Sequence, residues 1–480
     1  MELERFLQEN YNYNPDIKNS IEKNIKLWKA LYEGNAKDYR EYTLYNGQRK
    51  VKKMRYTLNM PKEISEDWSD IIWSEKCAIS LGNEKSQEDF NKLSKELCID
   101  STINQAIEKS GALGTSAVVI SVYDIVENKD GMSLDVSNAK TRTDIVDIEW
   151  VYPLTWNNKE ITECAFGSVQ YIKGKKYIVL SVHKLNDKGN YVIYNHLFLE
   201  QNKNITEIEF EDTMKEFDTG SNVKWFSIFK PLLTNNLFNN SPFGIPHYAN
   251  AIDSIKAVDL SFDALKNEVK DSKRRIFVRA SLLNYDNGQQ TLTFDPEDTD
   301  IYVLPKDATK DDLIQSDVED LRTDKQIEAL NTNLNILGNK VGFGENHYHF
   351  DGTNLSTATA VVSSNSKLFR RKKKLEIGYT LSIEELVKAV CYASTKYGTY
   401  NIDFDEISIQ FDDSIIEDKE AESVRALREV NAGLISREEY REKIFGETKE
   451  IAKKNIKEID EEEPTAEELA GIDKNITEEE

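Results

Sequence analysis

The chain has 480 residues, a length that usually corresponds to more than one domain. With 39% hydrophobic and 31% charged residues it fits a protein with packed cores, and its net charge of −23 argues against tight, sequence-general binding to nucleic acid. The sequence has no long apolar run and no N-terminal signal region, and its four cysteines include no Cys-x-x-Cys pair, so we expect a cytoplasmic protein without membrane helix, disulfide framework or zinc site.

The N-terminal part, as far as residue 110, is predicted to be mainly helical. Apolar residues three and four apart form one stripe within residues 1–40 and another that begins at Pro61, which is the spacing of a helix face. We expect the second helix to continue through Ile79, with Gly82 past its end. Two further helices fit residues 86–98 and 101–110.

Residues 42–59 form a polar and basic segment centred on Asn46-Gly47, a dipeptide typical of hairpin turns. The segment is therefore predicted to be a surface loop or hairpin. Two interpretations stay open: it is simply solvated, or it contacts a partner subunit.

From Thr115 onward the helical period gives way to β-rich segments, with turn signals such as Lys173-Gly174 and Lys188-Gly189 between them. These segments are 117–123, 144–152, 166–172, 177–184, 191–199 and 223–229. A helical layer followed by a mostly antiparallel sheet predicts an α+β fold.

The stretch from Ser241 to Val278 organises the remainder of the chain. After a turn-like Ser-Pro-Phe-Gly, Pro246 suits the first position of a helix, where a missing N–H costs nothing. Apolar residues then recur at spacings of three and four as far as Val269. They predict a helix over 248–272, roughly 25 residues and on the order of 38 Å long.

A small β-like segment separates this helix from a second long one. Strands are expected at 275–280, 291–294 and 301–304, and the next helix at 318–341. Two long helices that bracket a small β insert suggest a stalk with a cap.

Glycines at 342, 344 and 352 then interrupt the helical pattern, and no apolar period supports burial of the aromatic residues between them. We predict a long helix over 356–397, a strand over 402–411 and helices over 419–430 and 436–445. Residues 458–480 contain eleven acidic residues and one lysine, a net charge of −10, and are predicted to be disordered.

The run GIPHYANAID from Gly244 to Asp253, followed by DLSFDAL from Asp259 to Leu265, resembles the stem entry of the portal proteins of tailed bacteriophages, in the family found in phages of low-GC Gram-positive bacteria. The resemblance extends over most of the chain in order and length. It implies a multi-domain α+β portal fold that assembles as a ring.

The resemblance also implies a division of the chain into the parts of a portal. These are an N-terminal wing (1–240), an outer stem helix (241–273), a β-rich clip (274–317), an inner stem helix (318–341), a tunnel loop (342–355), a long wing helix with a return strand (356–415), a helical crown (416–457) and the acidic tail (458–480).

By the same resemblance, the function is that of a ring at one capsid vertex, through which DNA is packaged and later ejected. The implied partners are further copies of the chain (twelve, or thirteen when isolated), double-stranded DNA in the tunnel, the terminase large subunit, the major capsid and scaffold proteins, and a head-completion or adaptor protein. No membrane partner is implied. The expected location is the virion, after assembly in the host cytoplasm.

Residues of the inner stem helix and of the following loop are the candidates to face DNA in such a tunnel. They are Lys325, Asn331, Asn333, Lys340, Asn346, His347, Tyr348, His349 and Asn354. In the clip, the candidates to face terminase and connector proteins are Arg279, Asn284, Tyr285, Asp286 and Asn287. Twelve copies of the chain would carry a formal charge of about −276, twelve times −23, so rings of Lys325 and Lys340 would offer weak, screened contacts in a mostly repulsive wall.

Enzyme signatures are absent from the sequence. The segment 167–175 ends in Gly-Lys but has the wrong spacing for a phosphate-binding loop, and there is no His-Glu-x-x-His or Gly-x-Ser-x-Gly motif. We therefore expect no catalytic residues, no cofactor and no metal. The pair His347-x-His349 is interpreted as part of a channel-lining loop rather than as two metal ligands. The alternatives to the portal function are an acidic DNA-processing enzyme of a prophage and a capsid scaffold protein without a tunnel.

The basic run Arg370–Lys374 stands out against the acidic composition. Five consecutive residues point all round a helix and cannot form one DNA-facing stripe. Salt bridges to an acidic neighbouring subunit, a plain solvated surface and contact with DNA phosphates all stay open for this run.

Overall fold

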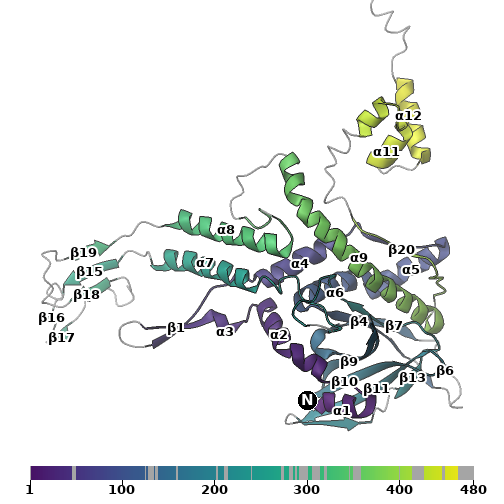
Figure 1. Ribbon diagram of the computed structural model, residues 1–480, viewed down its shortest axis with the longest axis horizontal. Helices are drawn as coiled ribbons and strands as arrows, with labels where there is room; N and C mark the ends of the chain where they lie inside the picture. The colour runs from purple at the N-terminus through teal and green to yellow at the C-terminus, as the bar shows by residue number, and fades with distance from the viewer. Residues whose placement is uncertain are drawn as a thin grey trace, which may run out of the picture. The chain divides into compact units, whose positions relative to one another are not determined.

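The computed structural model divides the chain into two units. The larger comprises Met1–Leu355 and Ser364–Phe411, and the smaller comprises Ser356–Ser363 and Asp412–Glu480. The described residues are 2–45, 50–124, 126–127, 134–135, 139–157, 160–201, 204–209, 214–238, 241–271, 275–279, 285–286, 289–290, 301–304, 314–317, 322–344, 346–349, 358–398, 400–412, 426–445 and 449–462. Helices and mainly antiparallel strands make up these residues, which confirms the predicted α+β class (Figure 1).

The helical layer of the larger unit follows the apolar periods of the sequence. It contains α1 (Glu2–Tyr11), α2 (Asp16–Tyr32), α3 (Lys37–Arg40), α4 (Met60–Ile72), α5 (Glu84–Leu97) and α6 (Ile99–Leu113). Asn83 caps α5, because its side-chain oxygen accepts from the backbone N–H of Lys85 at 2.9 Å. Between α3 and α4, the strands β1 (Glu41–Tyr45) and β2 (Lys50–Met54) pair as an antiparallel hairpin.

The prediction that the α4 helix continues through Ile79 was wrong. The helix ends at Ile72, and Ile79 lies in strand β3 (Ala78–Leu81), which pairs with β20 (Ile407–Gln410) from much later in the chain. Ile79 is buried as a residue of this strand, so its apolar character also fitted the spacing of a buried helix face. A strand pairing across more than 300 positions leaves no local signal.

Two sheets lie between α6 and the stem-like helices in sequence. The six-stranded sheet has the order β12-β11-β10-β9-β8, with β13 also on β11, and the three-stranded sheet has the order β14-β4-β7. The strands are β4 (Ser116–Tyr123), β7 (Lys140–Asp147), β8 (Val151–Asn157), β9 (Glu160–Ile172), β10 (Lys175–Leu185), β11 (Tyr191–Gln201), β12 (Asn204–Ile208), β13 (Glu216–Asp218) and β14 (Phe226–Phe229); β5 (Val126–Glu127) and β6 (Leu134–Asp135) form a separate pair.

The single strand predicted at 144–152 is in fact divided between the two sheets. Strand β7 ends at Asp147, a short 3₁₀ turn covers Ile148–Trp150, and β8 begins at Val151. Ile148 and Val151 are both buried, so the apolar run shows no break where the chain changes sheet.

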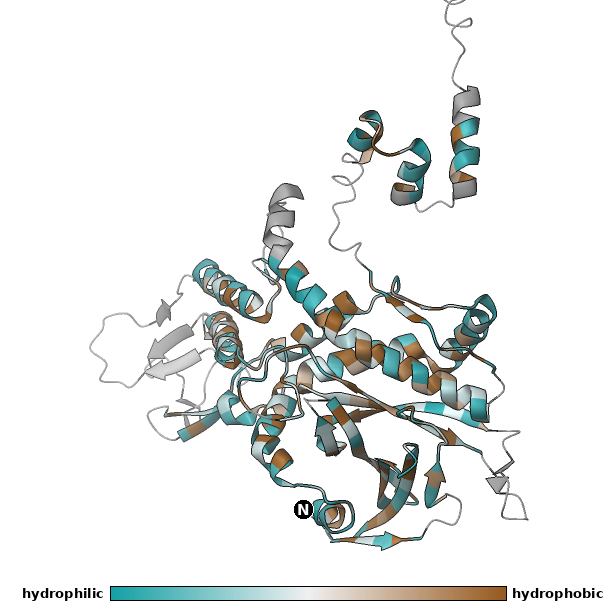
Figure 2. Ribbon diagram, turned by 45° about the vertical axis from the view of Figure 1, so that its right-hand side comes forward, coloured by the Kyte–Doolittle hydropathy of each residue, from teal (hydrophilic) through white to brown (hydrophobic). Residues whose placement is uncertain are grey.

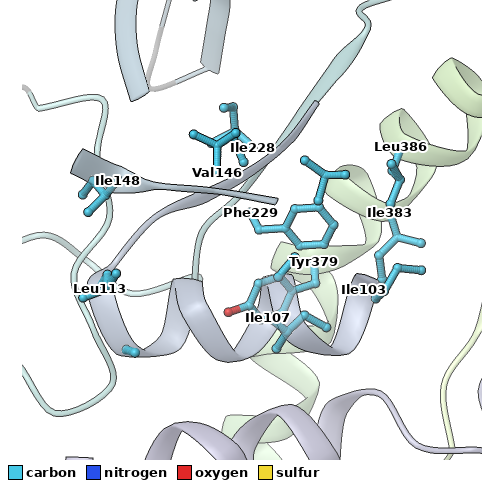
Figure 3. Close-up of a cluster of buried hydrophobic side chains, with 14 of the residues drawn as sticks. Ile103, Ile107, Leu113, Val146, Ile148, Ile228, Phe229, Tyr379, Ile383 and Leu386 are labelled. Atoms are coloured by element: carbon cyan, nitrogen blue, oxygen red, sulfur yellow. The ribbon is translucent and has the colours of Figure 1, made fainter. Parts of the chain in front are cut away.

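The main core lies between α6, the three-stranded sheet and the long helix α9 (Ala358–Tyr397) (Figure 3). Ile103 and Ile107 of α6 meet Phe229 of β14 and Ile383 of α9 in this core. The hydroxyl groups of Ser110 and Tyr379 lie 2.8 Å apart and so join α6 to α9 by a buried hydrogen bond.

Residues 241–251, which include most of the first run that carries the family resemblance, form a mostly buried connection rather than the start of a helix. The predicted helix at 248–272 begins instead at Ile252, as α7 (Ile252–Asp271). The Tyr248 hydroxyl donates to the carbonyl of Ala112 at 2.7 Å, and the N–H of His247 donates to the carbonyl of Gly111 at 2.9 Å. Tertiary contacts of these residues with the end of α6 replace helical hydrogen bonds.

Helix α7 packs against α8 (Thr323–Val341), and both helices carry hydrophobic and hydrophilic residues (Figures 1 and 2). Between them in sequence are β15 (Arg275–Arg279), β16 (Tyr285–Asp286), β17 (Gln289–Gln290), β18 (Ile301–Leu304) and β19 (Ile314–Asp317). Strand β15 is central in a three-stranded sheet, parallel to β18 and antiparallel to β19. The strand predicted at 291–294 lies outside the described residues.

Two boundaries in this region differ from those predicted. Helix α8 begins at Thr323 rather than 318, because the preceding residues Ile314–Asp317 form β19. The predicted start of α9 at residue 356 lies outside the described residues, which include this helix from Ala358. The strand predicted at 402–411 contains only the four residues of β20, Ile407–Gln410.

The smaller unit contains α11 (Arg437–Phe445) and α12 (Lys449–Glu462). Ser436 and Glu439 form a reciprocal capping box before α11: the N–H of Ser436 donates to the Glu439 carboxylate at 2.8 Å, and the N–H of Glu439 donates to the Ser436 hydroxyl at 3.1 Å. Helix α12 continues past residue 458, so the acidic tail does not begin where it was predicted. In the predicted helix 419–430, residues 419–425 lie outside the described part.

Candidate functional site

One face of α8 is exposed, and it differs from the face that was predicted. Lys325 and Lys340 are exposed as expected, but Asn331 is only 8% exposed, and the Asn333 side chain donates to the Ser261 hydroxyl of α7 at 2.7 Å. The exposed stripe consists of Asp324, Lys325, Glu328, Ala329, Thr332, Ile336 and Lys340. Thr332 and Ile336 were therefore missed, and their four-residue spacing from each other and from Lys340 is the signal that finds them.

Helix α7 supports α8 and is itself fixed by two buried carboxylates. Asp259 accepts hydrogen bonds from the Thr57 hydroxyl at 2.8 Å and from the backbone N–H of Leu58 at 3.1 Å. Asp263 accepts from the backbone N–H of Tyr56 at 3.0 Å. Buried carboxylates need such partners, so the segment after β2 and helix α7 form one hydrogen-bonded assembly.

The loop after α8 leaves the helix through residues with left-handed backbone. Gly342 has a φ of +105°, Gly344 a φ of +95° and Asn346 a φ of +62°. Glycine adopts such angles without steric cost, and asparagine tolerates them better than most residues. The N–H of Asn346 donates to the side chain of Asn335 at 2.9 Å, which ties the loop back to α8.

A stack of aromatic rings anchors the first part of this loop. Phe343 is buried and lies between Trp68 of α4, at 4.6 Å between ring centroids, and His347, at 4.2 Å with nearly parallel planes. The residues expected to avoid the core were His347, Tyr348, His349 and Phe350. This expectation was wrong for Tyr348, which is half-buried and packed against the core cluster. Phe350 lies outside the described residues.

The carboxylate of Asp67 in α4 contacts the side chains of both His347 and Tyr348. The Tyr348 hydroxyl donates to Asp67 Oδ2 at 2.7 Å, and His347 Nε2 lies 3.2 Å from the same oxygen. Burial, followed by the charge of Asp67, raises the pKa of Tyr348, so its hydroxyl stays protonated and keeps donating. Asp67 was not predicted, because one acidic residue on an amphipathic helix gives no sign of its partner.

Of the remaining predicted tunnel residues, Asn346 and His349 are exposed, whereas Asn354 lies outside the described residues. The structure therefore brings Asn346, His347 and Tyr348 together at the end of α8, with Lys340 one turn before the loop. For the clip, Arg279 lies in β15, and Tyr285 and Asp286 form β16. Asn284 and Asn287 lie outside the described residues.

Two lysines of the basic run on α9 pair with an acidic residue within the chain. Lys372 is fully buried, and its ammonium lies 2.7 Å from the Glu376 carboxylate, which also pairs with Lys373 at 3.3 Å. Burial lowers the pKa of Arg371. Lys372 and Lys373 thus have an acidic partner in the same helix, which the sequence interpretation did not consider. Contact of the run with a neighbouring subunit, a solvated surface and contact with DNA phosphates stay predictions.

In the part of the chain that the structure describes, no three His, Cys, Asp or Glu side chains are placed to hold a metal ion. None of the helices there combines the length and apolar character that crossing a membrane requires.

Comparison with known proteins finds a protein family whose model matches nearly the whole chain. A family model described as "Phage portal protein, SPP1 Gp6-like" matches residues 13–468. A solved structure titled "Neck of native GTA particle computed with C12 symmetry" aligns with 9% identity over 79% of this chain and 87% of that chain, at a TM-score of 0.34 that is too low to support a structural inference. No curated protein sequence matches the chain.

Proposed function

The chain belongs to the SPP1 Gp6-like family of phage portal proteins, and from this membership we propose that it forms a closed ring at one vertex of the capsid. The ring has twelve copies in the particle, and twelve or thirteen when isolated. The family match over residues 13–468 is the observation that carries the proposal, because it spans the predicted wing, stem, clip and crown together. That division of the chain stays a prediction.

We further propose that the exposed stripe of α8 faces DNA in the tunnel of this ring. Lys325 and Lys340 are fifteen positions apart, so they would form two positive rings about 22 Å apart along the helix axis. Glu328, between them, keeps the wall from binding DNA tightly. Asn331 and Asn333 are not part of this surface, because one is buried and the other bonds to α7.

The loop from Phe343 to Tyr348 is proposed as the narrow part of the tunnel. Its anchors on Asp67 and Trp68 fix where the loop leaves the helix pair. Replacing residues 345–350 by Gly-Ser would remove the Asp67 anchor, which His347 and Tyr348 form, so the variant is not a clean test of a gate. Changing only the exposed His349 to Ala is cleaner, because no described contact of the protomer is lost.

The clip is proposed to face terminase and the head-completion protein, while other parts of the ring contact capsid and scaffold proteins. The chain itself is proposed not to be an enzyme; the packaging motor would be the separate terminase. If the chain were instead a DNA-processing enzyme, the purified chain would hydrolyse nucleotides or phosphodiester bonds. If it were a scaffold protein without a tunnel, it would form no closed ring.

Particle assembly with and without the chain tests the proposed function. Capsids assembled without it should contain no packaged DNA, and supplying the chain during assembly should restore packaging. DNA-filled capsids in its complete absence would contradict the proposal. Hydrolysis of ATP by the chain alone, at a rate matching packaging, would favour the enzyme instead.

A further inference from the structure

The hairpin of β1 and β2 exposes apolar side chains on both of its faces. Residues directly opposite each other share a face, which places Tyr45 and Met54 on one side and Leu44 with Val51 on the other. Tyr45 is 69% exposed, Met54 49% and Leu44 44%. An isolated two-stranded hairpin is only marginally stable in water and needs packing against another element. Both faces therefore have surface that a partner would bury.

The charge of this hairpin is opposite to that of the rest of the chain. Its described residues, 41–45 and 50–55, contain three lysines and one arginine against Glu41, a net charge of +3. The other residues therefore sum to −26, given −23 for the whole chain. Lys50, Lys52 and Lys53 form no ion pair with any residue in the described part of the chain. A second copy of this acidic chain is electrostatically complementary to the hairpin.

The base of the hairpin is held firmly although its strands are exposed. The N–H of Arg55 donates to the carbonyl of Arg40 at 2.9 Å, and the Arg55 guanidinium donates to the carbonyl of Tyr39 at 2.8 Å. The next residue, Tyr56, is bonded to Asp263 of α7. In Figure 1 the two strands extend beyond α3 from this base. The hairpin is thus presented in a fixed position, which lowers the entropic cost of docking.

We propose that the β1–β2 hairpin of each copy docks on an acidic surface of the neighbouring copy, and that this contact helps to close the ring. The inference rests on the proposed ring. A hairpin that inserts into a different surface of the next subunit makes a head-to-tail contact, the kind from which rings are built. DNA is a poorer partner, because phosphates satisfy the lysines but leave Leu44 and Met54 without apolar contact.

Charge reversal in the hairpin tests this contact. The variant Lys50→Glu/Lys52→Glu/Lys53→Glu should lower the fraction of protein in closed rings about tenfold or more at equal protomer concentration. Circular dichroism should show a folded protein, since these side chains are exposed. The matched control Lys85→Glu/Lys92→Glu/Lys188→Glu makes the same change in charge at exposed sites in α5 and in the turn before β11, and should form rings like the wild type.

Failure of the inference and failure of the ring are separable in this experiment. If the wild type forms no ring, the proposed function fails. If the wild type, the control and the hairpin variant all form rings equally, only the docking inference is overturned. A hairpin variant that forms normal rings but loses retention on a DNA column would assign the hairpin to nucleic acid instead.

Cross-linking of mixed rings measures the contact directly. Rings assembled from equal amounts of ¹⁵N-labelled and unlabelled chain are treated with a carbodiimide, which joins lysines to carboxylates in contact. Peptides that join Lys50, Lys52 or Lys53 to an acidic residue should contain one labelled and one unlabelled partner in about half of the cases, the share that random mixing gives. Cross-links only within one isotope would overturn the inference.

Discussion

At the scale of single residues, several polar side chains form structural hydrogen bonds that cannot be predicted from the sequence. The carboxylate of Asp67 contacts the side chains of Tyr348 and His347, and that of Asp259 accepts from the Thr57 hydroxyl and the Leu58 N–H. The Tyr248 hydroxyl donates to the carbonyl of Ala112 at the end of α6. Each pair joins residues far apart in the chain, so no periodicity or spacing predicts it. The lysines of α8, by contrast, were predicted to be exposed from the helix period alone, and they are.

Removing the Tyr348 hydroxyl should weaken the anchor of the loop. Because Tyr348 donates to the carboxylate of Asp67 in a half-buried site, Tyr348→Phe should cost about 1.5–3 kcal/mol of unfolding free energy. The control Tyr400→Phe loses an exposed 3.2 Å bond to Glu96 and should change stability by less than about 0.5 kcal/mol. Denaturation of both variants checks this, and equal stability would show that the anchor contributes nothing.

His183 should make the protein less stable in acid. It is fully buried against Phe166 and Phe226, and burial lowers its pKa to about 3. The unfolded state, with a pKa near 6.5, then binds the proton that the folded state does not, so stability falls as the pH drops from about 6.5 toward about 3. His183→Leu should reduce this dependence by up to about 1.4 kcal/mol per pH unit. Denaturation at pH 4, 5 and 7 measures the slope; an unchanged slope contradicts the assignment.

At the scale of elements, the type of most helices and strands could be predicted, whereas their ends could not. The predicted α7 began too early because Tyr248 and Ala251 are buried, and burial in a connection mimics the apolar period of a helix. Helix α4 was extended to Ile79 for the same reason. Strands β12 and β13 were missed because they are short and largely exposed, with little apolar alternation.

The buried ion pair of α9 gives a test at this scale. Lys372 and Glu376 are almost fully buried, so Glu376→Leu alone should leave a buried ammonium without this partner and destabilise the protein by about 3–5 kcal/mol. The double variant Lys372→Met/Glu376→Leu removes both charges and should recover most of that loss. Thermal unfolding of the two variants compares them. If the double variant is no more stable than Glu376→Leu, the pair is not coupled as the structure indicates.

At the scale of the whole molecule, the family is set by the order of elements rather than by a short motif. Along the chain, the two long helices α7 and α8 precede and follow a set of short strands. A loop with glycines in the left-handed region comes next, and then the forty-residue helix α9. That order was visible in the sequence, and the family match spans it. The pairings of β3 with β20 and of β15 with β19 were not visible, since both depend on long-range contacts.

The proposed ring would cover apolar side chains that the single protomer exposes. Ile377 and Leu381 of α9 are 67% and 68% exposed and lie one turn apart, an apolar pair that a monomer gains nothing from presenting to water. Neighbouring copies in a ring would cover such residues.

The mass of the purified oligomer tests this account most directly. Native mass spectrometry of the full chain, at several protomer concentrations and at low salt, should show a closed assembly of twelve or thirteen copies of the 55.2 kDa chain, without a ladder of larger open species. A strictly monomeric protein at every concentration would contradict the ring, and with it the tunnel proposed for the α8 stripe.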